Sequence, residues 1–73
     1  MIKLTKREKQ VLMLLANGMT NKEISARLLI SESTAENHVH RIYNKICVSN
    51  RSQATAFAFQ AGYIQPNRLE SQD

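Results

Sequence analysis

Cysteine, glycine and proline are scarce in this 73-residue chain, and tryptophan is absent. The scarcity of the first three residue types excludes several classes of protein. The single cysteine, Cys47, cannot form an internal disulfide or a cysteine-based metal site, which excludes a disulfide-stapled secreted scaffold. Two glycines and one proline exclude a collagenous or low-complexity chain. The longest apolar run, 11–16, is far shorter than the roughly 20 residues that span a bilayer, and the N-terminus has no apolar signal segment. The sequence therefore predicts a soluble, unexported, cytoplasmic protein without a membrane partner.

The chain is long enough for one domain, and its charge is unevenly distributed. Ten Lys and Arg against six Asp and Glu give a net charge of +4 at pH 7. Because Glu70 and Asp73 lie near the C-terminus, residues 1–68 hold ten bases and four acids, a net charge of +6. A small domain this basic favours a polyanionic partner, nucleic acid ahead of a membrane surface, although a basic surface can also serve solubility alone.

Capping residues and apolar spacing predict four helices and no strands, an all-α fold. In two places a threonine is followed three residues later by a glutamate, the form of a capping box: Thr5 with Glu8, and Thr20 with Glu23. Two further residues suit N-caps: Ser31 and Asn50. With Gly18 and Gly62 just beyond helix ends, we expect helices at about 6–17, 21–28, 32–46 and 51–61. The domain is expected to span 1–66, and 67–73 to form a flexible tail.

The segment 32–46 has one apolar and one hydrophilic edge. Its apolar residues recur at steps of four, three and four, typical of one buried stripe: Ala35, Val39, Ile42 and Ile46. The opposite face is polar: Ser33, Asn37, His40, Arg41 and Asn44. A short helix, a turn at Leu29, Ile30 and Ser31, and then this longer helix make a helix-turn-helix arrangement. At about 22 Å long and about 10 Å thick, the longer helix suits a B-form major groove.

The residues that define these helices occur in a fixed order over residues 4–64. They are Leu4-Thr5-x-Arg7-Glu8, Val11-Leu12, Leu15-Ala16-x-Gly18, Asn21-Lys22-Glu23-Ile24, Leu28-x-Ile30-Ser31, Thr34, His38-Val39, Ile42, Lys45-Ile46-x-Val48 and Arg51-x-Gln53-Ala54. This order resembles that of the LuxR/FixJ-type helix-turn-helix domain. The resemblance implies a four-helix bundle that binds DNA as a dimer and controls transcription, with the third helix in the major groove. It also implies that the chain is either a small stand-alone member of the family or an excised C-terminal domain.

Three residues on the exposed face of the third helix match positions at which the family reads base edges: Glu36, Asn37 and His40. Asn37 can pair in bidentate fashion with adenine, and His40 can donate to guanine or a phosphate. A merely solvated helix face is the alternative. The chain departs from the family pattern at Ala35, usually β-branched, and at Glu36, often Lys or Arg. Because a carboxylate can accept from cytosine N4, Glu36 predicts altered specificity rather than lost binding.

A second stripe follows the flank of the same helix and is expected to contact DNA phosphates through Thr34, Arg41 and Lys45. His38 also lies on this flank, but it borders the core and a structural role is favoured. Lys22, at the start of the second helix, is a further phosphate candidate. Arg51 begins the fourth helix, where its position in the family fits either a phosphate contact or a salt bridge to an acid such as Glu8.

The last helix is expected to present an outward face on which two copies of the chain can associate: Ser52, Ala56, Phe59 and Tyr63. Small residues beside two aromatic residues allow two helices to approach closely, and the family resemblance points to the same helix for dimerisation. The alternative is that one of these aromatic residues folds back into a thin core. Cys47 is interpreted as a small hydrophobic residue rather than a redox sensor.

These patterns predict a sequence-specific, dimeric, DNA-binding transcriptional regulator of bacterial type, with double-stranded DNA and RNA polymerase as partners. Two alternatives remain: a protein-interaction module that uses the Phe59 and Tyr63 face, and, more weakly, a sigma-factor-like promoter module. Catalysis is not expected, because two histidines on different faces, one cysteine and scattered acids form no nucleophile–base pair. No metal, cofactor or small-molecule ligand is expected either.

Overall fold

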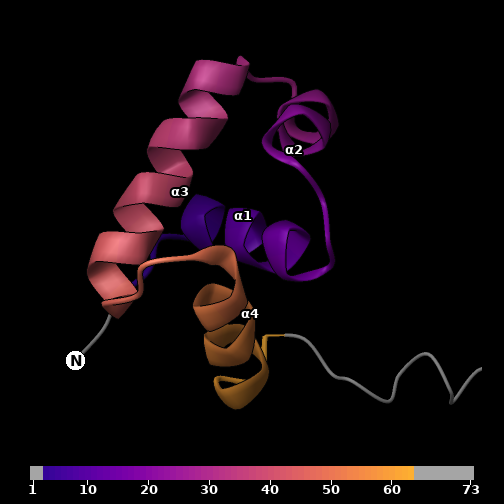
Figure 1. Cartoon of the computed structure of the whole chain (residues 1–73). Helices are drawn as coiled ribbons and strands as arrows, with labels where there is room; N and C mark the ends of the chain where they lie inside the picture. Colours follow the sequence, from indigo (N-terminus) through magenta and orange to yellow (C-terminus); the bar gives the residue numbers. More distant parts are fainter. Residues whose placement is uncertain (1–2, 64–73) are drawn as a thin grey trace, which may run out of the picture.

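The computed structural model describes residues 3–63, and within them the chain forms four helices and no strand (Figure 1). The helices are α1 (Lys6–Ala16), α2 (Asn21–Leu28), α3 (Glu32–Ile46) and α4 (Arg51–Gln60). The predicted all-α class is confirmed. Helices α1 and α4 each end one residue earlier than expected, because Asn17 and Ala61 act as their C-caps. The predicted tail, 67–73, lies outside the described residues.

The helix starts follow from local capping. The Thr5 hydroxyl accepts from the Glu8 N–H at 3.0 Å, and the Glu8 carboxylate accepts from the Thr5 N–H at 2.9 Å. Thr20 and Glu23 form the same reciprocal pair at 3.1 and 2.9 Å. Each box satisfies two backbone N–H groups that the first turn of a helix leaves without a partner. The other two helices begin at the predicted caps, Ser31 and Asn50.

Helices α1 and α3 each pack against all three of the other helices, and α1 lies between α3 and α4 (Figure 1). The buried apolar residues form one core: Leu4, Val11, Leu12, Leu15, Ile24, Ala35, Val39, Ile42, Ile46, Ala54 and Ala58. Burying each Leu or Ile contributes about 1.5–3 kcal/mol of transfer free energy. The predicted apolar stripe of α3 is confirmed in full, so the opposite, hydrophilic face of that helix points to solvent. None of the helices in the described region is long and apolar enough to cross a bilayer.

An ion pair joins the last turn of α3 to the first turn of α1. The Lys45 Nζ donates to Glu8 Oε1 at 2.8 Å and to the Lys3 carbonyl oxygen at 3.2 Å. Glu8 is only 4% exposed, which is unusual for a carboxylate. The Lys45 hydrogen bond, followed by the one from the Thr5 N–H, holds the pKa of Glu8 below its ordinary value of 4.5. The ionised form of Glu8 therefore stabilises the folded state.

Two non-glycine residues end helices in the left-handed conformation. Leu29 closes α2 at φ 60° and ψ 45°, and Cys47 closes α3 at φ 60° and ψ 48°. For L-residues this conformation costs about 1–2 kcal/mol, because Cβ crowds the following carbonyl. Both residues are exposed, and the side chain of Leu29 reaches 91% exposure at the turn between α2 and α3. Neither helix end is thus fixed by burial of its capping side chain.

Replacing Glu8 by Gln tests the ion pair. Gln keeps the capping box but loses the charge, so we expect the free energy of unfolding at pH 7 to fall by about 1–2 kcal/mol. Because the pKa of Glu8 is lowered on folding, the contribution of Glu8 is present at neutral pH and is lost as the pH falls below 4.5. Urea denaturation between pH 7 and pH 3 should therefore show the wild-type advantage shrinking with acid. An advantage that stays constant over this range would contradict the assignment.

Replacing Cys47 by Gly tests the left-handed C-cap of α3. Glycine adopts this conformation without the Cβ penalty, and the exposed thiol donates only weakly, at 4.0 Å, to the Asn44 carbonyl oxygen, so we expect the unfolding free energy to rise by about 0.5–1 kcal/mol. Cys47→Ala is the matched control, because alanine removes the thiol but keeps Cβ. Equal thermal stability of the Gly and Ala variants would show that the backbone at this position is not under strain.

Candidate nucleic-acid interface

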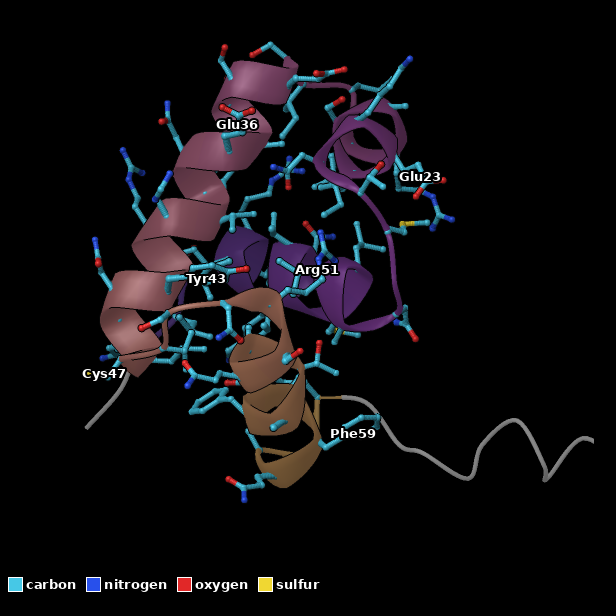
Figure 2. All side chains as sticks on the ribbon, in the orientation of Figure 1. Glu23, Glu36, Tyr43, Cys47, Arg51 and Phe59 are labelled. Atoms are coloured by element: carbon cyan, nitrogen blue, oxygen red, sulfur yellow. The ribbon has the colours of Figure 1, made fainter. Side chains whose placement is uncertain are left out.

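The hydrophilic face of α3 is free of internal contacts. Glu36, Asn37 and His40 are all exposed, and none of these three side chains hydrogen-bonds another residue of the described region. Figure 2 shows Glu36 on the outside of α3, clear of the other helices. The structure therefore brings the predicted base-reading residues together on one surface, because all three lie in the stretch 36–40 of helix α3. Over 15 residues α3 is about 22 Å long, which suits a major groove about 12 Å wide.

The flank of α3 carries the predicted phosphate contacts, and they differ in availability. Arg41 is exposed and makes no ion pair within residues 3–63. The half-buried Thr34 accepts from the Ser31 hydroxyl at 2.9 Å, which leaves the hydroxyl hydrogen of Thr34 to be donated elsewhere. Lys45 uses two of its three ammonium hydrogens on Glu8 and the Lys3 carbonyl, and its side chain is 38% exposed. Lys45 therefore has one donor left for a phosphate.

Residues at the start of α2 and on the inner flank of α3 differ in how far they are buried. Lys22 is exposed at the first turn of α2, as the phosphate prediction needs. His38 is half-buried, which agrees with the structural role favoured from the sequence, and its Nδ1 is buried without a hydrogen-bond partner. The Asn21 Oδ1 is a second buried polar atom without a hydrogen-bond partner. These two atoms are enclosed by the protein and cannot contact a duplex directly.

Arg51 does not form the salt bridge to Glu8 that was one of its two expected roles. Its Nη1 donates to the Leu15 carbonyl oxygen at 2.9 Å, at the opposite end of α1 from Glu8 (Figure 2). That carbonyl belongs to the last turn of α1, where carbonyls have no partner inside the helix. Arg51 thereby ties the start of α4 to the end of α1. As a whole residue Arg51 is exposed, and its other N–H groups remain free for a phosphate.

The outer face of α4 is narrower than predicted. Ser52, Ala56 and Phe59 are exposed, and Phe59 keeps 40% of its surface in solvent at the far side of α4 from the core (Figure 2). Tyr63 is half-buried against the core, with its ring centroid 6.3 Å from that of Phe57 and the two rings tilted at 55°. The alternative that one aromatic residue folds back thus holds for Tyr63, which follows the end of α4 and the positive φ of Gly62 (83°) and so leaves the helical face.

The most consequential contact that the sequence did not predict is the one between Lys45 and Glu8. The two residues are 37 positions apart, so no helical spacing relates them. The one signal in the sequence is that Glu8 interrupts the apolar face of α1 and is the only acid there. The surface as a whole offers exposed amide, imidazole, carboxylate and cationic groups. Among residues 3–63, no group of three or more His, Cys, Asp or Glu side chains is placed to hold a metal ion.

Comparisons with known proteins show to which family the chain belongs. Residues 3–58 match the family model described as bacterial regulatory proteins, luxR family. The chain is 46% identical over 61 residues to the uncharacterised transcriptional regulatory protein YxjL of Bacillus subtilis, covering 84% of this chain and 28% of the relative. It is 47% identical over 55 residues to the transcriptional regulatory protein LiaR of the same organism, covering 75% and 26%. It is 42% identical over 62 residues to the response regulator protein VraR of Staphylococcus aureus, covering 85% and 30%.

The chain spans less than a third of the length of these relatives. The matched segment includes all of α1, α2 and α3 and most of α4. The match therefore covers the complete helix-turn-helix, including the exposed face of α3. The chain belongs to the luxR family of bacterial regulatory proteins, as a DNA-binding transcriptional regulator domain.

Proposed function

We propose that this domain binds specific DNA sequences as a homodimer in the bacterial cytoplasm, with α3 in the major groove. The observation that carries the proposal is the division of α3 into two edges. Its aliphatic edge is buried in the core against α1 and α2, and on its hydrophilic edge Glu36, Asn37 and His40 form no hydrogen bond or ion pair within residues 3–63. A rigid helix with an unused polar face meets the need of groove recognition, in which side chains must reach base edges from a fixed backbone. RNA polymerase is a further proposed partner.

The base-reading role is proposed for Glu36, Asn37 and His40. Asn37 lies at the centre of the exposed face, and its amide can donate to adenine N7 while accepting from adenine N6. Glu36 can accept from the N4 amino group of cytosine, and elsewhere in the groove its charge would repel phosphates. We therefore propose a half-site that places a cytosine next to an adenine under the first turns of α3. His40 lies one turn further along and reads the neighbouring base or its phosphate.

The phosphate-contacting role is proposed for Lys22, Thr34, Arg41, Lys45 and Arg51. These residues come from the starts of α2 and α4 and from one flank of α3, so together they can hold both sides of a groove. Because Lys45 and Arg51 also stabilise the fold, Arg41 is the residue whose removal reports a phosphate contact most directly. In a dimer, two α3 helices would enter successive major grooves about 10 bp apart.

Salt dependence tests whether the domain binds a duplex through its phosphates. If three or so phosphates are neutralised per subunit, the slope of log K against log salt should be about −5 for the dimer. The measurement is a titration of labelled duplex, both selected and random, between about 50 and 200 mM salt. A slope near zero on every duplex would refute the DNA-binding proposal.

Paired substitutions on α3 separate base reading from phosphate contact. Asn37→Ala should weaken binding to the selected duplex by about 1–3 kcal/mol and leave random duplex unchanged, because only base contacts carry sequence information. Arg41→Ala should weaken both duplexes equally and make the salt slope shallower by about one for each phosphate that Arg41 neutralises. Equal effects on both duplexes for Asn37→Ala would remove it from the base-reading set.

The second candidate function is a protein-interaction module that uses α4. Two observations favour it: Phe59 is 40% exposed, and Glu36 places a negative charge on the proposed groove surface. Under the first proposal, the exposed part of the outer face of α4, Ser52, Ala56 and Phe59, joins two copies of the domain. Under the second, the same face binds a different regulator and no duplex is bound.

Phe59→Glu tests the role of α4. A charge in a two-fold interface meets its own copy, so we expect the dimer to dissociate and the affinity for a two-half-site duplex to approach that for a single half-site. Sedimentation with and without duplex measures both effects. Gln60→Glu is the matched control, because it adds the same charge to the next exposed position. A Phe59→Glu variant that dimerises on DNA as well as wild type would argue against this interface.

A further inference from the structure

A basic surface at the start of α1 has no role in the function proposed above. Lys3, Lys6, Arg7 and Lys9 are all exposed. The acid among them, Glu8, is buried and paired with Lys45, so it does not neutralise this surface. No salt bridge joins any of the four to another residue of the part of the chain that the structure describes. Four like charges over seven residues repel one another, and a bound polyanion would relieve that repulsion.

The position of this surface relates it to α3. The Lys45 ammonium lies 3.2 Å from the Lys3 carbonyl oxygen, which fixes the start of α1 beside the last turn of α3. Arg41 lies one turn before Lys45 on the same flank of α3 and is exposed. Basic residues therefore run along the flank of α3 and continue onto α1. Figure 1 shows the indigo segment that leads into α1 passing behind the lower half of α3, and α1 beginning beside that helix.

We propose that the basic surface of α1, made by Lys3, Lys6, Arg7 and Lys9, is a second contact for the DNA backbone, beside the contact made by α3. The inference rests on the proposed function, because α3 must lie in the groove for α1 to approach a strand. Where the C-terminal half of α3 leaves the groove, the long side chains of Lys3 and Lys6 meet phosphates next to those contacted by Arg41. This contact raises affinity for every sequence alike, since phosphates carry no base information. An acidic protein is the other occupant that such charge would fit, and the test separates the two.

The test compares two variants that lower the net charge equally. Lys3→Gln with Lys6→Gln removes two charges from the basic surface of α1, and Arg27→Glu removes two from the exposed end of α2. On random duplex of about two helical turns, the α1 variant should make the salt slope of the dimer shallower by about 1.8 to 3.6, for one or two contacts per subunit. Arg27→Glu should keep the wild-type slope. Thermal unfolding of the α1 variant should match wild type, because neither Lys3 nor Lys6 is buried. Arg27→Glu should unfold at a slightly lower temperature, because it puts a negative charge at the C-terminal end of α2 and four residues after Glu23.

A second measurement locates the contact on the duplex. Phosphates are replaced one at a time by neutral methylphosphonates, and each modified duplex is titrated with wild type and with the α1 variant. We expect at least one position at which the replacement weakens wild type but not the variant, the sign of a direct pairing. If wild type binds duplex and the α1 variant keeps both its slope and its phosphate profile, the inference is overturned and the surface is left for an acidic protein. If wild type itself binds no duplex, the proposed function fails first.

Discussion

The packing of the aliphatic edge of α3 against α1 and α2 is the contact on which the rest of the domain depends. It buries Ala35, Val39, Ile42 and Ile46, and by doing so it decides which side of α3 faces solvent. A rotation of α3 by one residue would move polar side chains into the core and hide part of the recognition surface. The geometry of the proposed binding face is thus a direct consequence of hydrophobic burial on its reverse side.

Because the core is small, polar contacts at both ends of α1 also fix the positions of α3 and α4. Lys45 fixes α3 to the first turn through Glu8, and Arg51 fixes α4 to the last turn through the Leu15 carbonyl. Lys45 was expected to contact DNA, and Arg51 either DNA or an acid such as Glu8. In the structure each makes a contact inside the protein. Part of the positive charge of the chain therefore stabilises the fold, and the fold holds the remaining basic side chains at the surface.

What could be predicted from the sequence is what local chemistry decides. The caps at Thr5, Thr20, Ser31 and Asn50 each act within three residues, so the helix starts agree with expectation. Contacts between distant segments could not be predicted this way: the partners of Lys45 and Arg51 depend on how the helices cross. The left-handed C-caps at Leu29 and Cys47 were also hidden, because glycine, the residue that signals them, is absent there. Tyr63 shows the same limit, because it lies beyond the end of α4, after Gly62 at φ 83°, where helical spacing no longer applies.

The fully buried residues of α4 are only Ala54 and Ala58, and the larger Phe57 is half-buried against the core. Two methyl groups contribute far less transfer free energy than the leucines of α1. A second copy seated on Phe59 would therefore supply α4 with apolar contact that its own domain does not provide. Self-association and the ordering of α4 would then be linked equilibria. The occupancy of paired half-sites would therefore depend on the folding stability of each monomer.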